Sequence, residues 1–333
     1  MVDGASSDHN AVHKIVSNPL GKDPALTSPD DAHPVPSDAA RSLVAGAYDT
    51  HVHIAPDVMD RRIDDLSLAA RFAQVGLAGF VIKSHYVTTA ERAAVVRKAV
   101  PGVDVLGAIT LNGSMGGMNP AAVEIAGRLG ARIVWMPTVD SRNQRSTTAA
   151  DLPGSKPAMW GALQADLHAQ GIVPDVVEVV SADGTVLEQV RTVLRVIAKH
   201  DMVLATGHLS APEILAVVKE ARALGVRRVV VTHPEFTSQR LTVSQQRELA
   251  AEGALLERCF TTPYTGKVAW PDLFENIRAV GIEHSVLSSD LGQPFNPPVE
   301  DGLPLFADKL LEAGFKEDEV RVMAVDNSRL IGL

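Results

Sequence analysis

The sequence lacks several features that define common protein classes. It contains a single cysteine, Cys259, in 333 residues, which excludes a disulfide framework and predicts a reducing compartment. No apolar run approaches the roughly 18 residues of a membrane-spanning helix. The start, MVDGASSDHN, lacks the basic and apolar parts of a signal peptide. These absences together predict a cytoplasmic protein.

The chain also lacks an excess of positive charge. Its 31 basic and 40 acidic residues leave a formal net charge of −9, which argues against nucleic acid or an anionic membrane as the main partner. We therefore expect a small-molecule substrate, and the composition is compatible with a homo-oligomer. Because hydrophobic residues make up 46% of the chain, it is not largely disordered, and it needs neither disulfide nor metal merely to fold.

Residues 1–46 differ in composition from the rest. They are rich in proline, aspartate, serine and alanine, as in NPLGKDPALTSPDDAHPVPSD, a composition that neither maintains a helix nor buries much surface. We predict an irregular N-terminal extension here and a folded domain over residues 47–333.

Eight short apolar runs alternate with amphipathic, alanine-rich stretches in this domain. The runs are nearly continuous, which is typical of parallel strands covered on both faces. They are AYDTHVHIA, GFVIKSHY, VDVLGAITLN, ARIVWMPTV, DMVLATGHLS, VRRVVVTHPEF, GALLERCFTT and HSVLSSDLG. Eight strand–helix units predict an α/β fold of the (β/α)8 TIM-barrel type. A doubly wound sheet would rarely need eight units, and no GxGxxG loop follows the first run.

One connection is too long for a simple loop. Residues 140–183 separate the fourth predicted strand from its helix, and they include Trp160 and a short helix predicted around 158–170. Connections of this kind lie on the catalytic face of a barrel. We predict that the segment covers the active site, with a plain linker as the alternative.

Histidines are concentrated at the ends of the predicted strands. Of the 11 histidines, five fall there, namely His51, His53, His85, His208 and His233. The eighth strand ends in Asp290. Because barrel active sites lie at the C-terminal ends of the strands, this distribution indicates a functional site.

The pattern at these strand ends suits a metal site. His51 and His53 are two residues apart, so a strand directs both imidazoles to one side. Neutral imidazole and carboxylate are good ligands for divalent metals. Together with His208, His233 and Asp290, the pair predicts one or two divalent ions per chain, zinc above all, with manganese or iron as alternatives.

This constellation resembles the amidohydrolase superfamily of metal-dependent barrel hydrolases, in particular its compact members. The matching residues are His51, His53, His208, His233 and Asp290, and the ending DNSRLIGL is also similar. The resemblance implies that the first pair and the aspartate hold one metal and that the later histidines hold a second. It also implies an activated water between the metals and a proton shuttle at the aspartate. Asp290, His233 and Lys83 are the candidate catalytic residues.

The sequence departs from the superfamily at the fourth strand. Many members supply a lysine or glutamate there as a bridging ligand, whereas this strand ends in Trp135-Met136-Pro137-Thr138. Lys83, at the end of the second strand, is the available substitute, and a CO2-derived carbamate on it could bridge two metals. The alternatives are a hydrogen-bonding or substrate-binding Lys83 beside a single metal, or a solvated lysine.

Clues to the substrate are few. His85 follows Lys83 by two residues, and Tyr86 and Tyr264 follow the second and seventh strands. Arg142 follows the fourth strand and Arg258 lies on the seventh, and an arginine at the barrel mouth can bind a carboxylate with two hydrogen bonds. These five residues are our candidates for substrate binding. The opposite possibility is that they only hydrogen-bond within the protein or face solvent.

The residues and the resemblance together predict a metal-dependent hydrolase. It would use a metal-activated water to cleave an amide, cyclic amide or lactone bond in a small molecule. The first alternative is a metal-dependent non-oxidative decarboxylase on the same scaffold. The others are a Schiff-base aldolase that uses Lys83 and a non-catalytic metal-binding protein.

Overall fold

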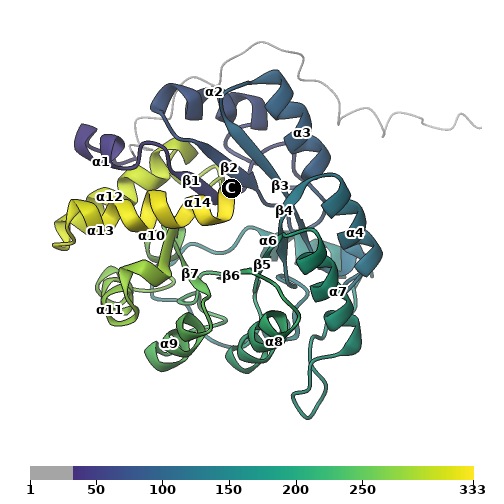
Figure 1. Cartoon of the computed structure of the whole chain (residues 1–333). Helices are drawn as coiled ribbons and strands as arrows, with labels where there is room; N and C mark the ends of the chain where they lie inside the picture. Colours follow the sequence, from purple (N-terminus) through teal and green to yellow (C-terminus); the bar gives the residue numbers. More distant parts are fainter. Residues whose placement is uncertain (1–32) are drawn as a thin grey trace, which may run out of the picture. The chain divides into compact units, whose positions relative to one another are not determined.

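Eight parallel strands form a sheet in the order in which they occur along the chain, and this sheet is a nearly closed barrel (Figure 1). The computed structural model describes residues 33–333. Its strands are β1 (Tyr48–Val52), β2 (Gly79–Ile82), β3 (Asp104–Thr110), β4 (Ala131–Trp135), β5 (Val203–Ala205), β6 (Arg228–Val231), β7 (Leu255–Cys259) and β8 (Ser285–Ser288). Backbone bonds from Asp290 N to His51 O and from His53 N to Leu291 O, both 2.8 Å long, join the end of β8 to β1.

A helix follows each strand before the next begins, which confirms the predicted (β/α)8 barrel. These helices are α2 (Asp65–Val75), α3 (Ala90–Ala99), α4 (Pro120–Arg128), α7 (Glu188–Lys199), α8 (Ala211–Ala223), α9 (Val243–Ala251), α11 (Trp270–Val280) and α12 (Gly302–Glu312). Their starts show the capping chemistry expected from the sequence. Ser210 and Glu213 form a capping box at α8, and the side chain of Asp64 accepts a hydrogen bond from Ser67 N at α2.

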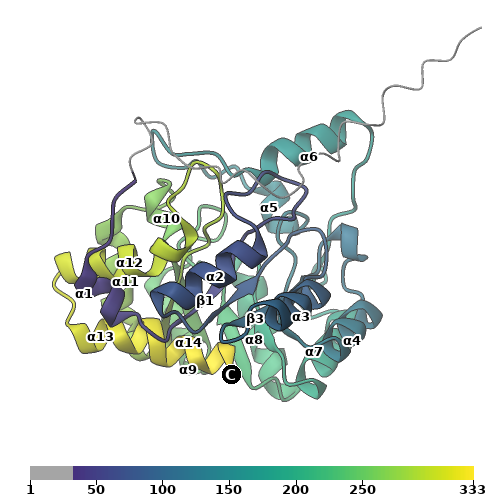
Figure 2. The same cartoon turned by 90° about the horizontal axis from the view of Figure 1, so that it is seen from above.

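The barrel interior is packed with apolar side chains below the strand ends. Val81, Ile133, Val203, Val230 and Val286 meet there, one from each of five strands. Ile331 joins them from α14 (Asn327–Gly332), which crosses the end of the barrel opposite α6 (Figures 1 and 2). This filling leaves the C-terminal ends of the strands as the place for a ligand.

The chain differs from the sequence prediction near its N-terminus. Most of the expected irregular segment over 1–46 lies outside the described residues, and its described part contains the short helix α1 (Asp38–Leu43). The side chain of Ser37 caps α1, a local signal that the prediction did not use. At the other end, the chain closes with one helical run made of α13 (Glu317–Arg321), a π-helical turn over Val322–Asp326, and α14.

The long connection after β4 contains two helices. These are α5 (Arg142–Ser146) and α6 (Trp160–Ala169), and the next helix of the barrel starts only at Glu188. Figure 2 shows α5 and α6 on the side of the barrel opposite α14. This is the side on which the strands end.

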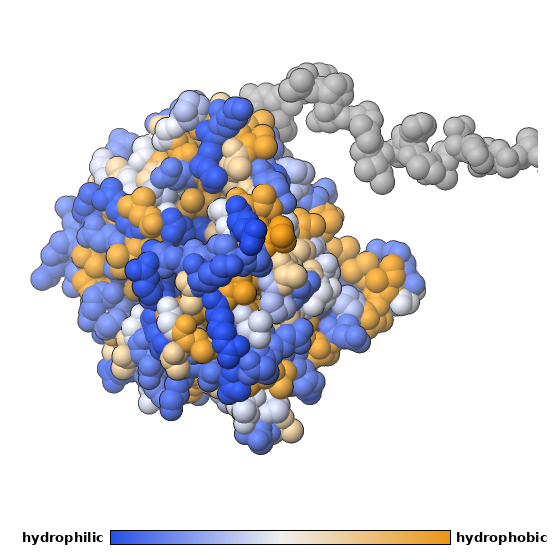
Figure 3. Space-filling model, turned by 45° about the vertical axis from the view of Figure 1, so that its right-hand side comes forward, coloured by the Kyte–Doolittle hydropathy of each residue, from blue (hydrophilic) through white to orange (hydrophobic). Residues whose placement is uncertain are grey.

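The surface in Figure 3 mixes hydrophilic residues with scattered apolar ones. Single exposed apolar side chains such as Val95 and Ile125 are normal for a globular protein. Between residues 33 and 333, no helix combines the length and apolar character that a bilayer span requires.

Candidate metal centre

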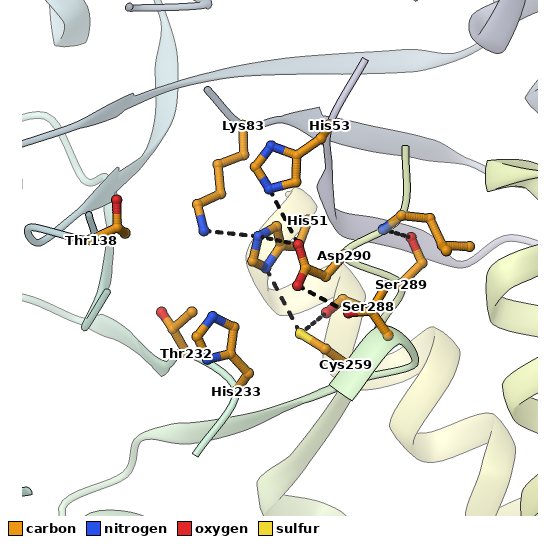
Figure 4. Close-up of polar contacts among 12 residues, drawn as sticks. His51, His53, Lys83, Thr138, Thr232, His233, Cys259, Ser288, Ser289 and Asp290 are labelled. Carbon is orange, nitrogen blue, oxygen red and sulfur yellow. Dashed lines mark hydrogen bonds and ion pairs between the residues drawn. The ribbon is translucent and has the colours of Figure 1, made fainter. Parts of the chain in front are cut away.

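Three of the predicted ligands converge where β1 and β8 end. His51 Nε2 lies 3.1 Å and His53 Nε2 3.2 Å from Asp290 Oδ1. The three ligand atoms lie within 4.8 Å of one another, close enough to hold one metal ion. His51 and His53 share a face because strand side chains alternate. Asp290 reaches them from a backbone with a positive φ of 54° (Figure 4).

Glu257 on β7 holds His51 from the side away from Asp290. Its Oε2 lies 3.2 Å from His51 Nδ1, and the exposed fractions of the two side chains are 2% and 0%. A carboxylate at Nδ1 places the imidazole proton there and leaves Nε2 free to bind a metal, as in known carboxylate–histidine–metal sites. Cys259, two residues along the strand, lies 3.8 Å from the same Nδ1.

The two later histidines are oriented by glutamine side chains. His208 Nδ1 lies 3.0 Å from Gln144 Oε1, and His233 Nδ1 lies 2.9 Å from Gln239 Oε1. Gln239 is held in turn, because its amide donates to Gly207 O over 2.6 Å. A carbonyl acceptor at each Nδ1 fixes the proton there and exposes Nε2. The rings of His208 and His233 lie 5.0 Å apart, so both can serve one ion.

Burial sets the protonation states that metal ligands require. Burial and the charge of Arg61 lower the pKa of His53 to about 3. Burial lowers the pKa of His233 to about 4 and that of His208 well below its usual range. Burial works against the charge of Asp290, but His51, His53 and Lys83 outweigh it and hold its pKa well below the ordinary value. Neutral imidazoles around a carboxylate therefore fit a divalent cation.

Lys83 lies beside the histidines of this site. Its Nζ is 2.9 Å from His51 Nε2 and 5.2 Å from the ring centre of Trp135, and only 2% of the residue is exposed. Burial lowers the pKa of its amine. Figure 4 shows the side chain directed at His51 and Asp290. The end of the fourth strand offers no ligand at this point, since Thr138 instead hydrogen-bonds His85 Nδ1 at 2.8 Å.

A cavity with about 70 Å³ of water-accessible space opens onto the site. His53, His208, His233 and Asp290 line it on the barrel side, and residues 156–160 of the long connection line the opposite side. That segment is fastened across the mouth by Leu152 N to Gly266 O and Lys156 N to Thr265 O, both 3.1 Å, and by an ion pair between Asp151 and Lys267. The volume corresponds to roughly five waters, so access requires a small ligand or movement of the cover.

The residues predicted to bind substrate occupy different environments. His85 lines the cavity and stacks on His53, with ring centres 5.0 Å apart. Tyr86, Arg142 and Tyr264 are not among the lining residues. Tyr86 contacts His85 edge-on and Tyr264 packs on Phe260. The side chain of Arg142 is 60% exposed and pairs with Glu178.

Arg258 requires a correction, because it does not reach the barrel mouth. Its side chain is fully buried and pairs with Glu235, with Gln246 as a second partner at 2.7 Å. The alternation along β7 explains the difference. Glu257 points inward to His51, so its neighbour Arg258 must point outward to the surrounding helices.

Several residues of the site were not predicted from the sequence. Arg61, in the connection after β1, lines the cavity. The sequence analysis assigned no role to Glu257, Gln144 or Gln239. The alternation on β7 could have identified Glu257 as inward-facing. Only the tertiary structure brings Gln144 to His208, which is 64 residues away in sequence, whereas Gln239 follows His233 by six residues.

Solved structures with this fold confirm, at the level of fold, the resemblance to amidohydrolases. An amidohydrolase from Pseudomonas aeruginosa superposes with a TM-score of 0.55 at 13% identity, covering 88% of this chain and 98% of its own. The probable dipeptidase PvdM from the same organism gives 0.55 at 10% identity, with 88% and 96% covered. A dipeptidase described as a metallopeptidase gives 0.53 at 15% identity, with 87% and 98% covered.

Sequence comparisons point to a narrower group. No curated protein matches the chain. A family model described as a family of unknown function, DUF6282, matches residues 46–257. The match covers the first six strands, the start of β7 and the histidines at 51, 53, 208 and 233, which is more than half of the chain. The protein therefore belongs to the DUF6282 family.

Proposed function

We propose that this protein is a metal-dependent hydrolase that cleaves an amide, cyclic amide or lactone bond in a small molecule. The observation that carries the proposal is the convergence of His51, His53 and Asp290, with ligand atoms within 4.8 Å of one another. His208 and His233 line the same cavity. His51, His208 and His233 each have an oxygen acceptor at Nδ1, which leaves Nε2 for a metal.

The ligands divide into two sets. His51, His53 and Asp290 would hold one divalent ion, and His208 and His233 a second. A bound ion of this kind lowers the pKa of water toward neutrality and polarises a carbonyl. Zinc suits a set of imidazoles and one carboxylate, and manganese or iron remain compatible.

Asp290 has the position and charge for proton transfer. Its Oδ1 faces the two histidines, while its Oδ2 accepts a hydrogen bond from Thr261 Oγ1 over 3.0 Å. The carboxylate lines the cavity, so it can accept a proton from the attacking water and deliver it to the leaving group. His233, across the cavity, would help to hold the reacting group.

Lys83 is the proposed bridge between the two ions, as a carbamate. The neutral amine attacks CO2, an N–C bond forms as one C=O π bond opens, and the nitrogen loses a proton to water, so the product is an anion with two carboxylate oxygens. The buried, pKa-lowered Nζ beside His51 supports this step. Lys83→Ala should then lose one or both metals, and Lys83→Arg should not recover them because guanidinium cannot be carbamylated. Unchanged metal content in both variants would exclude the bridge.

Metal analysis of protein purified without chelator tests the central proposal. We expect two equivalents per chain, and hydrolysis of some member of an amide and lactone panel that is lost with chelator and restored by metal. His51→Ala supplies the negative control. Absence of bound metal, with no uptake on addition, would contradict the proposal.

A decarboxylase is the second candidate, favoured by one observation. The end of the fourth strand supplies no bridging ligand, and an unmodified Lys83 ammonium, 2.9 Å from His51 Nε2, adds a positive charge that disfavours a pair of cations in the site. This reaction predicts one metal equivalent and CO2 release without consumption of water. Two equivalents with a hydrolysed product would exclude it.

A further inference from the structure

Arg61 is a buried cation with unused hydrogen-bonding capacity. It lies in the connection between β1 and α2, and its side chain is 2% exposed. Its Nε donates to Asp57 Oδ2 over 2.7 Å, and its Nη2 lies 2.7 Å from the same oxygen and 3.5 Å from His53 Nδ1. Among the described residues no acceptor pairs with Nη1. The ion pair with Asp57 thus fixes the side chain of Arg61, and Arg61 lines the cavity.

The contact between Arg61 and His53 is incompatible with metal binding through His53 Nε2. A guanidinium can only donate, so His53 Nδ1 must accept, which places the ring proton on Nε2. Ligation through Nε2 moves that proton to Nδ1, where it faces the Nη2 donor. Asp57 still pairs with Nε and Nη2, but Nη1 and the N–H of Nη2 beside His53 then have no acceptor among the described residues. Buried N–H groups without acceptors are costly, so the loaded site favours an acceptor from the ligand.

The charge balance of the cavity agrees with an anionic ligand. Three cationic residues line it, namely Arg61, Lys156 and Lys267, against a single carboxylate, Asp290. Asp290 already contacts His53, and Lys267 is paired with Asp151. Lys156 donates to Phe295 O over 3.1 Å. Arg61 is also paired, with Asp57, but as a guanidinium it still has N–H donors on Nη1 and Nη2 that this pair does not use.

We propose that Arg61 binds a carboxylate of the substrate, so that the protein acts on small carboxylic acids. The inference rests on the proposed metal-dependent function and adds the substrate class to it. Two parallel N–H donors of a guanidinium match the two oxygens of a carboxylate. Arg61 contacts His53, and His53 contacts Asp290. The substrate carboxylate would therefore bind close to the reacting bond, separated from it by about the width of the His53 ring.

Calorimetric titration with succinate tests the inference without requiring turnover. Its neutral analogue, succinamide, has nearly the same shape and lacks the charge. We expect metal-loaded wild-type protein to bind succinate at millimolar concentration or below and to bind succinamide at least tenfold more weakly. Arg61→Gln should weaken succinate binding by about 10- to 100-fold and leave succinamide unchanged. Arg61→Lys keeps the positive charge but loses the two parallel N–H donors, so its affinity for succinate should lie between those of the wild type and Arg61→Gln.

Two further variants control for side effects. Arg61→Gln leaves Asp57 buried and unpaired, so the double variant Asp57→Asn/Arg61→Gln removes both charges if the single variant does not fold. Arg128→Gln breaks an ion pair of the same spacing, Arg128–Glu124 at 2.8 Å on α4, outside the cavity, and should bind succinate normally.

Three outcomes would overturn the inference. They are no succinate binding by the wild type, equal affinity of wild type and Arg61→Gln, or tighter binding of inorganic phosphate than of succinate, which would change the ligand class. Titration of chelator-treated protein separates this inference from the proposed function. If the protein never takes up metal but binds succinate through Arg61, the carboxylate site stands and the metal-dependent hydrolase fails.

Discussion

Removal of the Glu257 carboxylate should weaken metal binding without removing a ligand. Glu257 Oε2 lies 3.2 Å from His51 Nδ1 in a fully buried setting. Burial opposes its charge, but His51, His233 and Lys83 outweigh burial and lower the pKa of Glu257, so it is ionised at neutral pH. Glu257→Leu frees the His51 ring to rotate and to place its proton on Nε2, which must be empty for ligation.

The expected loss follows from this single hydrogen bond. Partners of metal-bound histidines contribute about 10- to 100-fold in metal affinity, or about 1.4–2.7 kcal/mol. The 3.2 Å separation is longer than the roughly 2.7–2.9 Å of a strong charge-assisted bond. We therefore expect a loss nearer to tenfold for Glu257→Leu. Glu257→Gln keeps an oxygen acceptor at the same place and should lose less.

Competition for zinc against a chromophoric chelator measures these affinities. The main rival role makes Glu257 itself a ligand, since its carboxylate, His51 Nδ1 and Cys259 Sγ also lie within 4.8 Å of one another. Direct ligation predicts that Glu257→Gln and Cys259→Ser each lose metal as severely as Glu257→Leu. Wild-type affinity in Glu257→Leu would refute the positioning role altogether.

Three further predictions concern the site and the fold. His51→Ala should lose bound metal, as measured by elemental analysis. Circular dichroism should still show an intact barrel, because the stability of the barrel resides in its core layers. Full metal content would remove His51 from the ligand set. Asp290→Asn should lower kcat by roughly 10²–10⁴-fold with a smaller change in KM, and near-normal turnover would remove Asp290 from proton transfer. Burial and the 2.5 Å hydrogen bond to Asp104 raise the pKa of Tyr48 from 10.0 to about 12. The neutral phenol is thus favoured in the folded state, and its stabilisation is complete below pH 10.0 and is lost as the pH rises through about 12. Tyr48→Phe should reduce the loss of unfolding free energy at alkaline pH by about 1–2 kcal/mol after allowance for solvent screening. Urea unfolding of both proteins below and above this pH range would measure the difference. The same dependence of unfolding free energy on pH in both proteins would contradict the shift.

Local patterns were sufficient to predict the barrel and to select the candidate ligands. Eight apolar runs separated by capped helices allow few architectures, and parallel strands with short connections bring their C-terminal ends to one face. The two-residue spacing of His51 and His53 then places both imidazoles on one side of a strand. The structure places these histidines beside Asp290, 239 residues after His51 in the chain, because the end of β8 closes onto β1.

The environment of each ligand could not be read from the sequence. Whether Glu257 or Arg258 faces the barrel depends on the pleat phase of β7, and a shift of one residue would exchange them. Arg61 lies in an irregular connection, where no periodicity indicates the direction of a side chain. Its role depends on Asp57, which holds it in place, and on closure of the barrel around it.

The sequence by itself thus determined the architecture and the candidate metal-binding side chains, because strand periodicity and position at a strand end are local properties. Only the tertiary structure decided which partners hold those side chains and what the cavity accepts. Gln144 reaches His208 from the long connection, and residues 156–160 of the same connection cover the site. Such contacts join segments far apart in the chain, and packing geometry, which no local pattern encodes, selects them.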